Sequence, residues 1–307
     1  MRIAYFCLGS GSGNLMIGAS IFNALVRIGE QTEFTAITDS EFTPIFSKWF
    51  NIIQIKGEPE KLFTDDLNTE LYRALKSVNP DLIIVFMMWM PIMPLLEGFS
   101  CPKVLLIRQC PQKWLIMKTA PEDSIDVNFA DYSAAFSIEP GFQPHGFAPL
   151  PPLILKNRDE LPSPEASRAK LGLIAGEKLC IAADNGPEDE YRDIIEKSKA
   201  LCPFDCTLIT ATNKGGGENS LFPLIDYLPA VDFVVGSAGY NLFYECRYLN
   251  IPARFFAYER KAEDQMWRIE TNGHYHFHTN GADILAGRLL NLLYNRENLR
   301  NRKYLKI

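Results

Sequence analysis

The sequence predicts an α/β protein made of two doubly wound domains that face a cleft. Short apolar runs alternate with helical patterns along the chain, which is typical of parallel sheets with crossover helices. A proline-rich stretch divides this alternation into two halves, and a length of 307 residues suits two domains of about 150 residues each. Open α/β sheets bind ligands beyond the carboxyl ends of their strands, so the cleft is the expected binding region.

In the first half, continuous apolar runs predict buried strands, and apolar residues at helical spacing predict helices. The predicted strands are Ile3–Leu8, Phe34–Thr38, Ile52–Ile55, Leu82–Phe86, Val104–Ile107 and Ala134–Ile138. The predicted helices are Asn14–Ile28 and Leu67–Val78, and Asn79-Pro80 ends the second of them.

The stretch from Pro140 to Pro164 contains seven prolines and predicts a linker, because proline lacks the N–H that helices and strand ladders need. We place the boundary near Leu153, which gives domains of residues 1–152 and 153–307. The strands predicted after it are Lys178–Ala183, Cys206–Thr210, Phe233–Gly236 and Ala253–Phe256. The predicted helices are Glu188–Ala200, Asn241–Leu249 and Gly281–Tyr294, and Gly215-Gly216-Gly217 forms a loop.

Composition narrows the class of protein. A net charge of −6, from 31 basic and 37 acidic residues, argues against a broad nucleic-acid surface, which needs a basic stripe. Seven cysteines, an odd number, indicate reduced thiols and a cytoplasmic location. We expect no secretory signal and no transmembrane helix, because the apolar stretch Leu82–Leu96 is shorter than the roughly 20 residues a span needs.

The first motif is Gly9-Ser10-Gly11-Ser12-Gly13-Asn14, between the first predicted strand and helix. Glycines allow a tight turn and close approach of a ligand, and the helix start behind them offers N–H groups to an anion. The spacing fits neither the dinucleotide fingerprint nor a phosphate loop with lysine. A tight turn without a ligand is the alternative.

A second motif is Gly236-Ser237-Ala238-Gly239-Tyr240-Asn241, which follows a predicted strand and opens the helix that carries Glu245. Asn241 and Glu245 are four residues apart and share a helix face. An amide and N–H groups there suit a diphosphate, and the carboxylate one turn later suits ribose hydroxyls. The alternative is an ordinary capped helix with Glu245 in solvent.

A third motif, Glu263-Asp264-Gln265, follows the predicted strand Ala253–Phe256. Two carboxylates and an amide can hydrogen-bond a polyhydroxylated ring. The alternative is the acidic first turn of a helix, which the helix dipole favours in any case.

Together these motifs resemble the nucleotide-sugar glycosyltransferases of the GT-B fold, which has two Rossmann-like domains. Gly239-Tyr240-Asn241 with Glu245 resembles the G-x-N-x-x-x-E part of the plant-type signature. The same segment resembles that of the bacterial N-acetylglucosaminyltransferase that acts on the lipid-linked peptidoglycan precursor. Asp264-Gln265 resembles the D-Q pair that contacts the donor sugar, and Gly9–Gly13 resembles the glycine loop of the superfamily.

The resemblance implies an acceptor-side domain at 1–152 and a donor-binding domain at 153–307. It implies transfer of a sugar from a UDP-linked donor to an unknown acceptor, with no metal and no cofactor. Gly11, Ser12, Gly13 and Asn14 would lie near the reaction centre. The implied donor-binding residues are Ser237, Gly239, Tyr240, Asn241, Glu245, Glu263, Asp264 and Gln265. A catalytically weak nucleotide-sugar-binding protein and a sugar-nucleotide epimerase of the same fold are the alternatives.

Two residues depart from the family pattern. Asn14 stands where a histidine often ends the glycine loop, and an amide cannot act as a general base. Ser237 replaces the histidine that contacts phosphate in the plant-type signature. The base therefore stays unassigned among Asp39, Glu41 and Asp126.

Two further features carry alternative interpretations. His274, His276 and His278 would share one face of a strand and could chelate a metal, but a short strand before the last helix explains them equally. Met87–Pro94 is a methionine-rich segment in the domain expected to hold the acceptor. A hydrophobic or lipid-linked acceptor is one hypothesis, since methionine adapts to apolar partners, and burial in the core is the other.

Overall fold

The protein, as a computed structural model, divides into two compact units. The structure describes residues 1–9, 11–56, 70–90, 92–112, 115–118, 124–126, 132–174, 176–202, 205–212 and 221–304. The first unit comprises Met1–Ser10, Asn14–Leu153 and Asn280–Ile307, and the second comprises Gly11–Gly13 and Ile154–Thr279.

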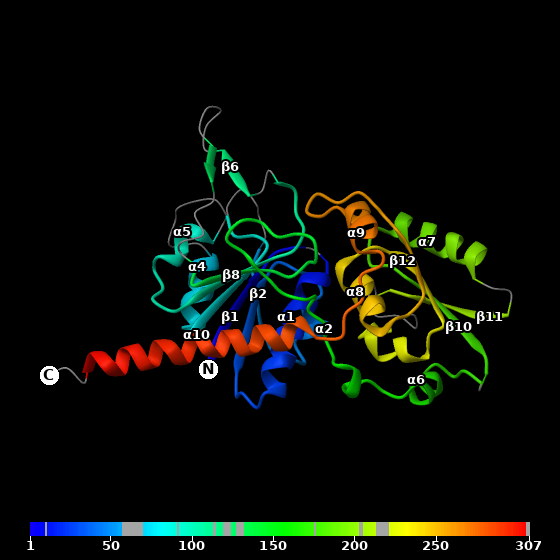
Figure 1. Ribbon diagram of the computed structural model, residues 1–307, viewed down its shortest axis with the longest axis horizontal. Coiled ribbons are helices and arrows are strands. Elements are labelled where there is room, and N and C mark those ends of the chain that lie inside the picture. Colours follow the sequence, from blue (N-terminus) through cyan, green and yellow to red (C-terminus); the bar gives the residue numbers. More distant parts are fainter. Residues whose placement is uncertain are drawn as a thin grey trace. The chain divides into compact units, whose positions relative to one another are not determined.

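The first unit is built on a seven-stranded parallel sheet with the order β3-β2-β1-β4-β5-β8-β9. Its strands are β1 (Arg2–Cys7), β2 (Glu33–Thr38), β3 (Asn51–Gln54), β4 (Leu82–Phe86), β5 (Lys103–Ile107), β8 (Ala134–Ser137) and β9 (Ala148–Pro149). The helices of this part are α1 (Gly13–Arg27), α2 (Thr43–Phe46), α4 (Glu70–Val78), α5 (Met93–Leu96) and α10 (Gly281–Tyr304). A separate antiparallel pair consists of β6 (Ile116–Lys118) and β7 (Ser124–Asp126). The strand order reverses between β1 and β4, as in doubly wound folds. Figure 1 labels β1, β2 and β8 of this sheet.

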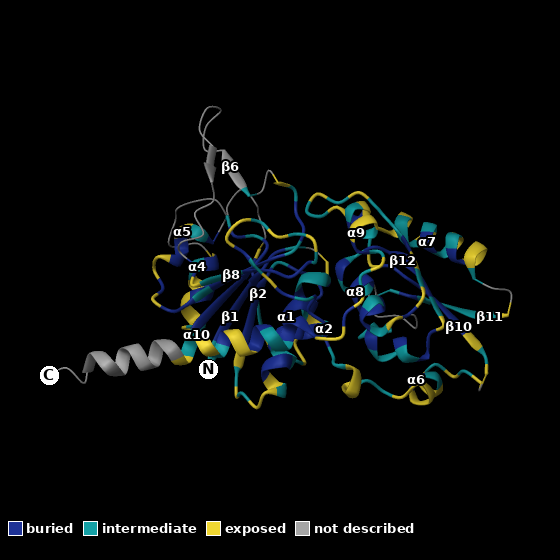
Figure 2. Cartoon of the chain, viewed as in Figure 1, coloured by how far each residue is buried: buried dark blue, intermediate teal, exposed yellow. Residues whose placement is uncertain are grey.

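The central strands of this sheet form the core of the first unit. All five residues of β4 are buried, as are the last five of β1 (Figure 2). Parallel strands covered on both faces need such continuous apolar runs. Gly18 lets α1 approach β1 closely, because a Cβ at this position would lie 2.7 Å from the ring of Tyr5.

The second unit contains a four-stranded parallel sheet with the order β11-β10-β12-β13. Its strands are β10 (Lys178–Ala183), β11 (Cys206–Ala211), β12 (Phe233–Ser237) and β13 (Ala253–Phe256). Its α-helices are α6 (Pro164–Lys170), α7 (Glu188–Leu201), α8 (Tyr240–Leu249) and α9 (Gln265–Asn272). Short 3₁₀ turns occur at η3 (Arg158–Glu160), η5 (Leu224–Asp226) and η6 (Leu228–Ala230). The predicted α/β class is confirmed in both units.

The final helix belongs to the first unit, whereas the sequence assigns all of 153–307 to one domain. Gly281 donates its N–H to the carbonyl of Pro152 at 3.0 Å. Arg27, at the end of α1, forms an ion pair with Asp283 of α10 at 2.5 Å. These contacts hold α10, drawn red in Figure 1, against the first unit, although α10 follows the second unit in the sequence.

Two predicted features fall partly or wholly outside the described residues. The start of the predicted helix Leu67–Val78 lies outside them, and α4 is described from Glu70. The Gly215-Gly216-Gly217 loop also lies outside them. Within the described chain, no helix is long and apolar enough to cross a membrane.

Replacing Gly281 with alanine tests how α10 is held. A Cβ there would overlap the carbonyl oxygen of Pro151, a backbone atom that cannot move aside without shifting the linker. We expect Gly281→Ala to lower the free energy of unfolding by about 1–3 kcal/mol, measured by urea denaturation. Gly287→Ala in the same helix is the control, because nothing lies within 4 Å of a Cβ there. Equal stability of Gly281→Ala and the wild type would contradict this account.

Candidate functional site

Two polar side chains meet at the carboxyl edge of the second unit's sheet. β10 and β12 are neighbours, with Ala183 opposite Gly236. The next residues are Asp184 and Ser237, and the Ser237 hydroxyl donates a hydrogen bond to Asp184 Oδ1. Both are buried, at 4% and 7% exposure, and burial raises the pKa of the Asp184 carboxyl. The sequence predicts a binding role for Ser237 but does not single out Asp184, because one aspartate after a strand is a common pattern.

The helices that follow these two strands differ in charge at their N-termini. The first turn of α7 carries Glu188, Asp189 and Glu190, whereas the first turn of α8 has no acidic residue. Gly239 is the N-cap of α8, and no side chain caps this helix. N–H groups at a helix start carry partial positive charge and have no acceptor within the helix. The start of α8 is therefore the better suited of the two to an external anion.

Glu245 lies one turn into α8 and is buried, with 6% exposure. No other described residue forms a hydrogen bond with its carboxyl group. Burial, with the nearby charge of Asp226, raises the pKa of this carboxyl to about 8. A buried, protonated carboxyl of this kind can both donate and accept a hydrogen bond, so it is equipped to hold a ligand hydroxyl.

The residues of the third motif support the loop before α9. Asp264 is the N-cap of α9 and accepts a hydrogen bond from the N–H of Trp267 at 2.9 Å. Gln265 is buried, accepts from the N–H of Tyr258 at 3.0 Å and donates to Glu263 at 3.3 Å. The alternative interpretation of this motif, an acidic start of a helix, therefore describes the contacts of Asp264. An N-cap at this position is visible in the sequence as an aspartate before a helical pattern.

Arg268 connects the turn before α8 to the loop before α9, and it belongs to none of the sequence motifs. Its side chain is fully buried, donates to the carbonyl of Ala238 at 2.6 Å and forms an ion pair with Glu263 at 2.9 Å. Its guanidinium also lies 5.8 Å from the centre of the Tyr240 ring. The buried polar residues Gln265, Arg268 and Asn272 recur at helical spacing along α9, and this pattern is the signal that could have revealed it.

A second arginine lies at the same edge of the sheet. Arg260, in the loop between β13 and α9, binds Glu190 of α7 through both terminal nitrogens. Their side chains are 24% and 15% exposed. Gly186 leaves room for this pair, because a Cβ there would contact Glu190 and lie 2.7 Å from Asp184 and 2.9 Å from Arg260. Charged groups of both signs therefore converge beside the start of α8.

The two ends of the glycine loop, Gly9 and Asn14, belong to the first unit and are held by its residues. Gly9 has a positive φ of 135°, and its N–H donates to Asp39 Oδ1 at 2.7 Å. The Asn14 side-chain amide donates to the carbonyl of Leu8 at 2.6 Å. A Cβ on Gly9 would lie 3.0 Å from the amide of Asn14, so a larger residue would disturb the turn. Asn14 thus has a structural contact of its own.

The remaining loop residues and the candidate bases are placed as follows. Gly11 is exposed and Ser12 is buried, while Ser10 lies outside the described residues. Of the candidate bases, Asp39 contacts the glycine loop and Glu41 is exposed. The side chain of Asp126 lies outside the described part of the chain.

The methionine-rich segment is neither wholly core nor wholly surface. Met87, Trp89 and Ile92 are buried, whereas Met88 and Met90 are partly exposed. The predicted strand through the three histidines is wrong, because residues 274–278 form no strand. The histidines therefore do not share a strand face.

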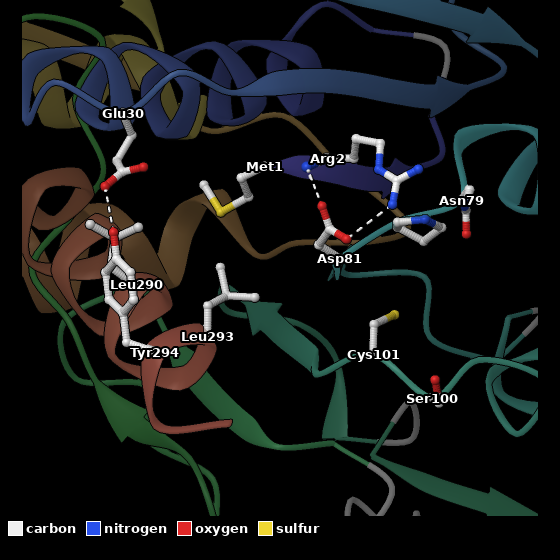
Figure 3. A pocket seen from close by; sticks show the side chains of 11 residues that line it. Met1, Arg2, Glu30, Asn79, Asp81, Ser100, Cys101, Leu290, Leu293 and Tyr294 are labelled. Carbon is white, nitrogen blue, oxygen red and sulfur yellow. Dashed lines mark hydrogen bonds and ion pairs between the residues drawn. The ribbon is translucent and has the colours of Figure 1, made fainter. Parts of the chain in front are cut away.

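A cavity of about 470 Å³ lies at the opposite, amino end of the first unit's sheet. Figure 3 shows Asp81 accepting hydrogen bonds from the Arg2 backbone N–H at 2.8 Å and from its guanidinium at 3.1 Å. Tyr294 of α10 donates to Glu30 at 3.0 Å across the same cavity. These polar groups bind one another, and ligands of open α/β sheets bind at the carboxyl ends of strands. We therefore interpret the cavity as part of the region where α10 packs against the rest of the first unit.

The architecture is similar to that of known glycosyltransferases. VinC, a glycosyltransferase solved in complex with dTDP, is similar with a TM-score of 0.58 and 14% identity, over 95% of this chain and 91% of VinC. The spinosyn forosaminyltransferase SpnP gives a TM-score of 0.60 and 12% identity, over 95% of this chain and 90% of SpnP. SsfS6 of Streptomyces sp. SF2575, complexed with thymidine diphosphate, gives 0.54 and 16%, over 82% and 81%. The fold is GT-B.

This GT-B assignment concerns architecture, because the identities are low. No protein-family model matches the chain, and no curated protein matches it by sequence. In the second GT-B unit, the structure brings Ser237, Gly239 and Glu245 to the strand–helix junction of β12 and α8. It adds Asp184 and Arg260 to that junction.

Removing the charge of Arg268 tests the connection between the two loops. Arg268→Leu would leave the Glu263 carboxylate buried without its partner and the Ala238 carbonyl without its donor. We expect a loss of about 3–5 kcal/mol in the free energy of unfolding, measured by urea denaturation. Arg192→Leu on α7 is the control, because its side chain is 74% exposed. A loss no larger than that of the control would contradict the role given to Arg268.

The buried carboxyl of Glu245 predicts a pH dependence of stability. Because its folded-state pKa is raised from 4.5 to about 8, its favourable contribution is complete below about pH 4.5 and is lost as the pH rises through 8. Glu245→Gln stays neutral, so its stability relative to the wild type should increase with pH, by on the order of 2–4 kcal/mol at high pH. Urea midpoints at several pH values measure this. Parallel pH curves for the variant and the wild type would contradict it.

Proposed function

We propose that the protein transfers a sugar from a nucleoside diphosphate sugar to an acceptor hydroxyl. The observation that carries this proposal is the start of α8. No side chain caps the N-terminus of α8, and its first turn contains no acidic residue. One turn later lies the buried carboxyl of Glu245, which has no hydrogen-bond partner among the described residues. The first feature suits a diphosphate, and the second suits a ribose. The GT-B architecture supports the same function.

In this proposal, Gly239 and Asn241 lie beside the diphosphate and Glu245 holds the ribose hydroxyls. Asp264, which is exposed at the start of α9, contacts the sugar. Glu263 and Gln265 position the loop that presents it, because their polar atoms bind within that loop and to Arg268.

The aromatic ring of Tyr240 and the hydroxyl group of Ser237 complete the proposed donor site. Tyr240 is buried against Tyr244, with ring centres 4.8 Å apart, and supports the first turn of α8. Ser237 ends β12 directly before this turn and donates to Asp184. Both residues act on the donor by shaping the start of the helix.

The donor nucleotide proposed here is a pyrimidine diphosphate. The sequence resemblance favours UDP, whereas VinC and SsfS6 were solved with thymidine diphosphate. The narrower resemblance to the peptidoglycan-precursor enzyme rests on the segment Gly239–Glu245. A hydrophobic or lipid-linked acceptor remains a hypothesis, supported by the partly exposed Met88 and Met90.

The proposed reaction forms a bond between the acceptor oxygen and the anomeric carbon while the bond from that carbon to the diphosphate breaks. The leaving diphosphate takes the electron pair, and the N–H groups of α8 stabilise its charge. We propose that this field removes the need for a metal ion. The acceptor proton passes to a carboxylate, for which Asp39 is the candidate because it binds the glycine loop.

A binding protein without turnover is the second candidate. It is favoured by Asn14, which replaces the expected histidine and donates its amide to the carbonyl of Leu8. Release of free nucleoside diphosphate in the presence of candidate acceptors distinguishes an enzyme from a sensor.

The first test is a thermal-shift measurement with UDP-, TDP-, GDP- and CDP-sugars. A ligand at about 100 times its Kd stabilises the native state by about 2.7 kcal/mol, so we expect a rise in Tm with a pyrimidine nucleotide. Glu245→Ala should lose this rise. Glu270→Ala on α9 should keep it, because Glu270 is exposed. No rise with any of the four at millimolar concentration would refute the donor site.

A further inference from the structure

The Asp184 carboxylate lies next to the start of α8, where the proposed function places the diphosphate of the donor. Asp184 is 4% exposed and accepts a hydrogen bond from Ser237, the last residue of β12. Ser237 is two residues before Gly239, the N-cap of α8. The Asp184 carboxylate also accepts from the N–H of Gly186 at 2.9 Å, so the backbone holds it in place. Any group bound at the start of α8 lies close to this side chain.

Among the described residues, the charged and titratable groups around Asp184 do not supply a spare cation. Glu190 faces it from α7, and Arg260 faces it from the loop after β13. Arg260 is already bound through both terminal nitrogens to Glu190, so the positive charge nearest to Asp184 is neutralised. Tyr258, which lies in the same loop and donates to Asp193, is also within electrostatic range. With Asp184 ionised, the described residues of this cluster together carry a net negative charge.

A diphosphate brought to α8 therefore meets like charge at short range. Two negative groups in a shared, poorly solvated site repel each other, which raises the free energy of the state in which both are ionised. The group with the higher pKa then takes up a proton. Burial raises the pKa of Asp184, which makes this carboxyl the one that yields. Protonation leaves its hydrogen-bonding geometry in place and removes the repulsion.

We propose that Asp184 is a proton-linked specificity residue of the donor site, which admits a nucleoside diphosphate when Asp184 is protonated and repels it when Asp184 is ionised. This inference rests on the proposed function. It implies that binding of a diphosphate takes up one proton. Binding of the corresponding nucleoside, which carries no phosphate, does not involve Asp184.

The test is isothermal titration calorimetry with TDP-glucose and UDP-glucose between about pH 4 and about pH 8.5, a range that begins at the ordinary pKa of an aspartate carboxyl. The diphosphate of these probes keeps the same charge over this range. For the wild type, we expect affinity to fall by up to about tenfold per pH unit as the pH rises from the pKa of Asp184 in the free protein towards its higher pKa in the complex. Buffers of different ionisation enthalpy should report uptake of about one proton per diphosphate bound. Thymidine and uridine serve as probes that isolate any contribution of Glu245.

Asp184→Asn removes the charge and keeps an oxygen for Ser237. We expect it to bind TDP-glucose or UDP-glucose at least about tenfold more tightly than the wild type near pH 8, with the pH slope reduced to that of the nucleoside. Glu188→Gln is the matched control, because it removes a carboxylate from the first turn of α7 whose side chain is 62% exposed. The control should behave as the wild type.

Three outcomes would count against these proposals. Weaker binding by Asp184→Asn at every pH, with its Tm unchanged, would show that the carboxylate helps to bind the donor and would overturn the inference. Wild-type affinities without proton uptake would overturn it too, and this measurement needs no variant. Both results leave the proposed function standing, since a nucleotide sugar still binds. Absence of binding by the wild type and by Asp184→Asn across the whole pH range would refute the proposed function and the inference together.

Discussion

The buried guanidinium of Arg268 is the interaction on which the carboxyl edge of the second unit's sheet depends. It binds the Ala238 carbonyl in the turn before α8 and the Glu263 carboxylate in the loop before α9, and its face lies near Tyr240. Two loops that follow different strands are thereby held at a defined separation. A fully buried charge is tolerated only when it is paired and hydrogen-bonded, so each of these contacts is needed by the others. The positions of Gly239 and Glu245 follow from this arrangement.

The distribution of charge decides which helix at this edge can receive an anion. Both α7 and α8 begin after parallel strands, and both present N–H groups at the same edge of the sheet. The carboxylates in the first turn of α7 already satisfy its dipole, and Glu190 in addition binds Arg260. No side chain caps the start of α8 and no acidic residue lies in its first turn, so this helix start is the better suited of the two to an anion. The buried Asp184 carboxyl lies beside it, because it accepts a hydrogen bond from Ser237 at the end of β12.

Residues that match donor-binding patterns in the sequence make different kinds of contact in the structure. The pair Asp264-Gln265 matches a sugar-binding pattern, yet Asp264 caps α9 and Gln265 is buried in hydrogen bonds to its own loop. Glu245 matches a ribose-binding pattern, and its burial without a partner among the described residues agrees with that role. A pattern of residue types cannot separate these cases, because a cap, a loop contact and a ligand contact use the same chemical groups.

The sequence by itself determined the main strands of both sheets, although it predicted none of β6, β7, β9, α2, α5 and α6. The predicted strands Leu82–Phe86 and Lys178–Ala183 coincide with β4 and β10, because strands covered on both faces are apolar along most of their length. It also located the strand–helix junction at Gly236–Asn241, since glycines and a helix start leave a local signature. Only the tertiary structure decided that α10 returns to the first unit and that Arg268 and Asp184 join the binding edge. Those outcomes depend on contacts between residues far apart in the chain, and a periodic pattern of nearby residues carries no information about such contacts.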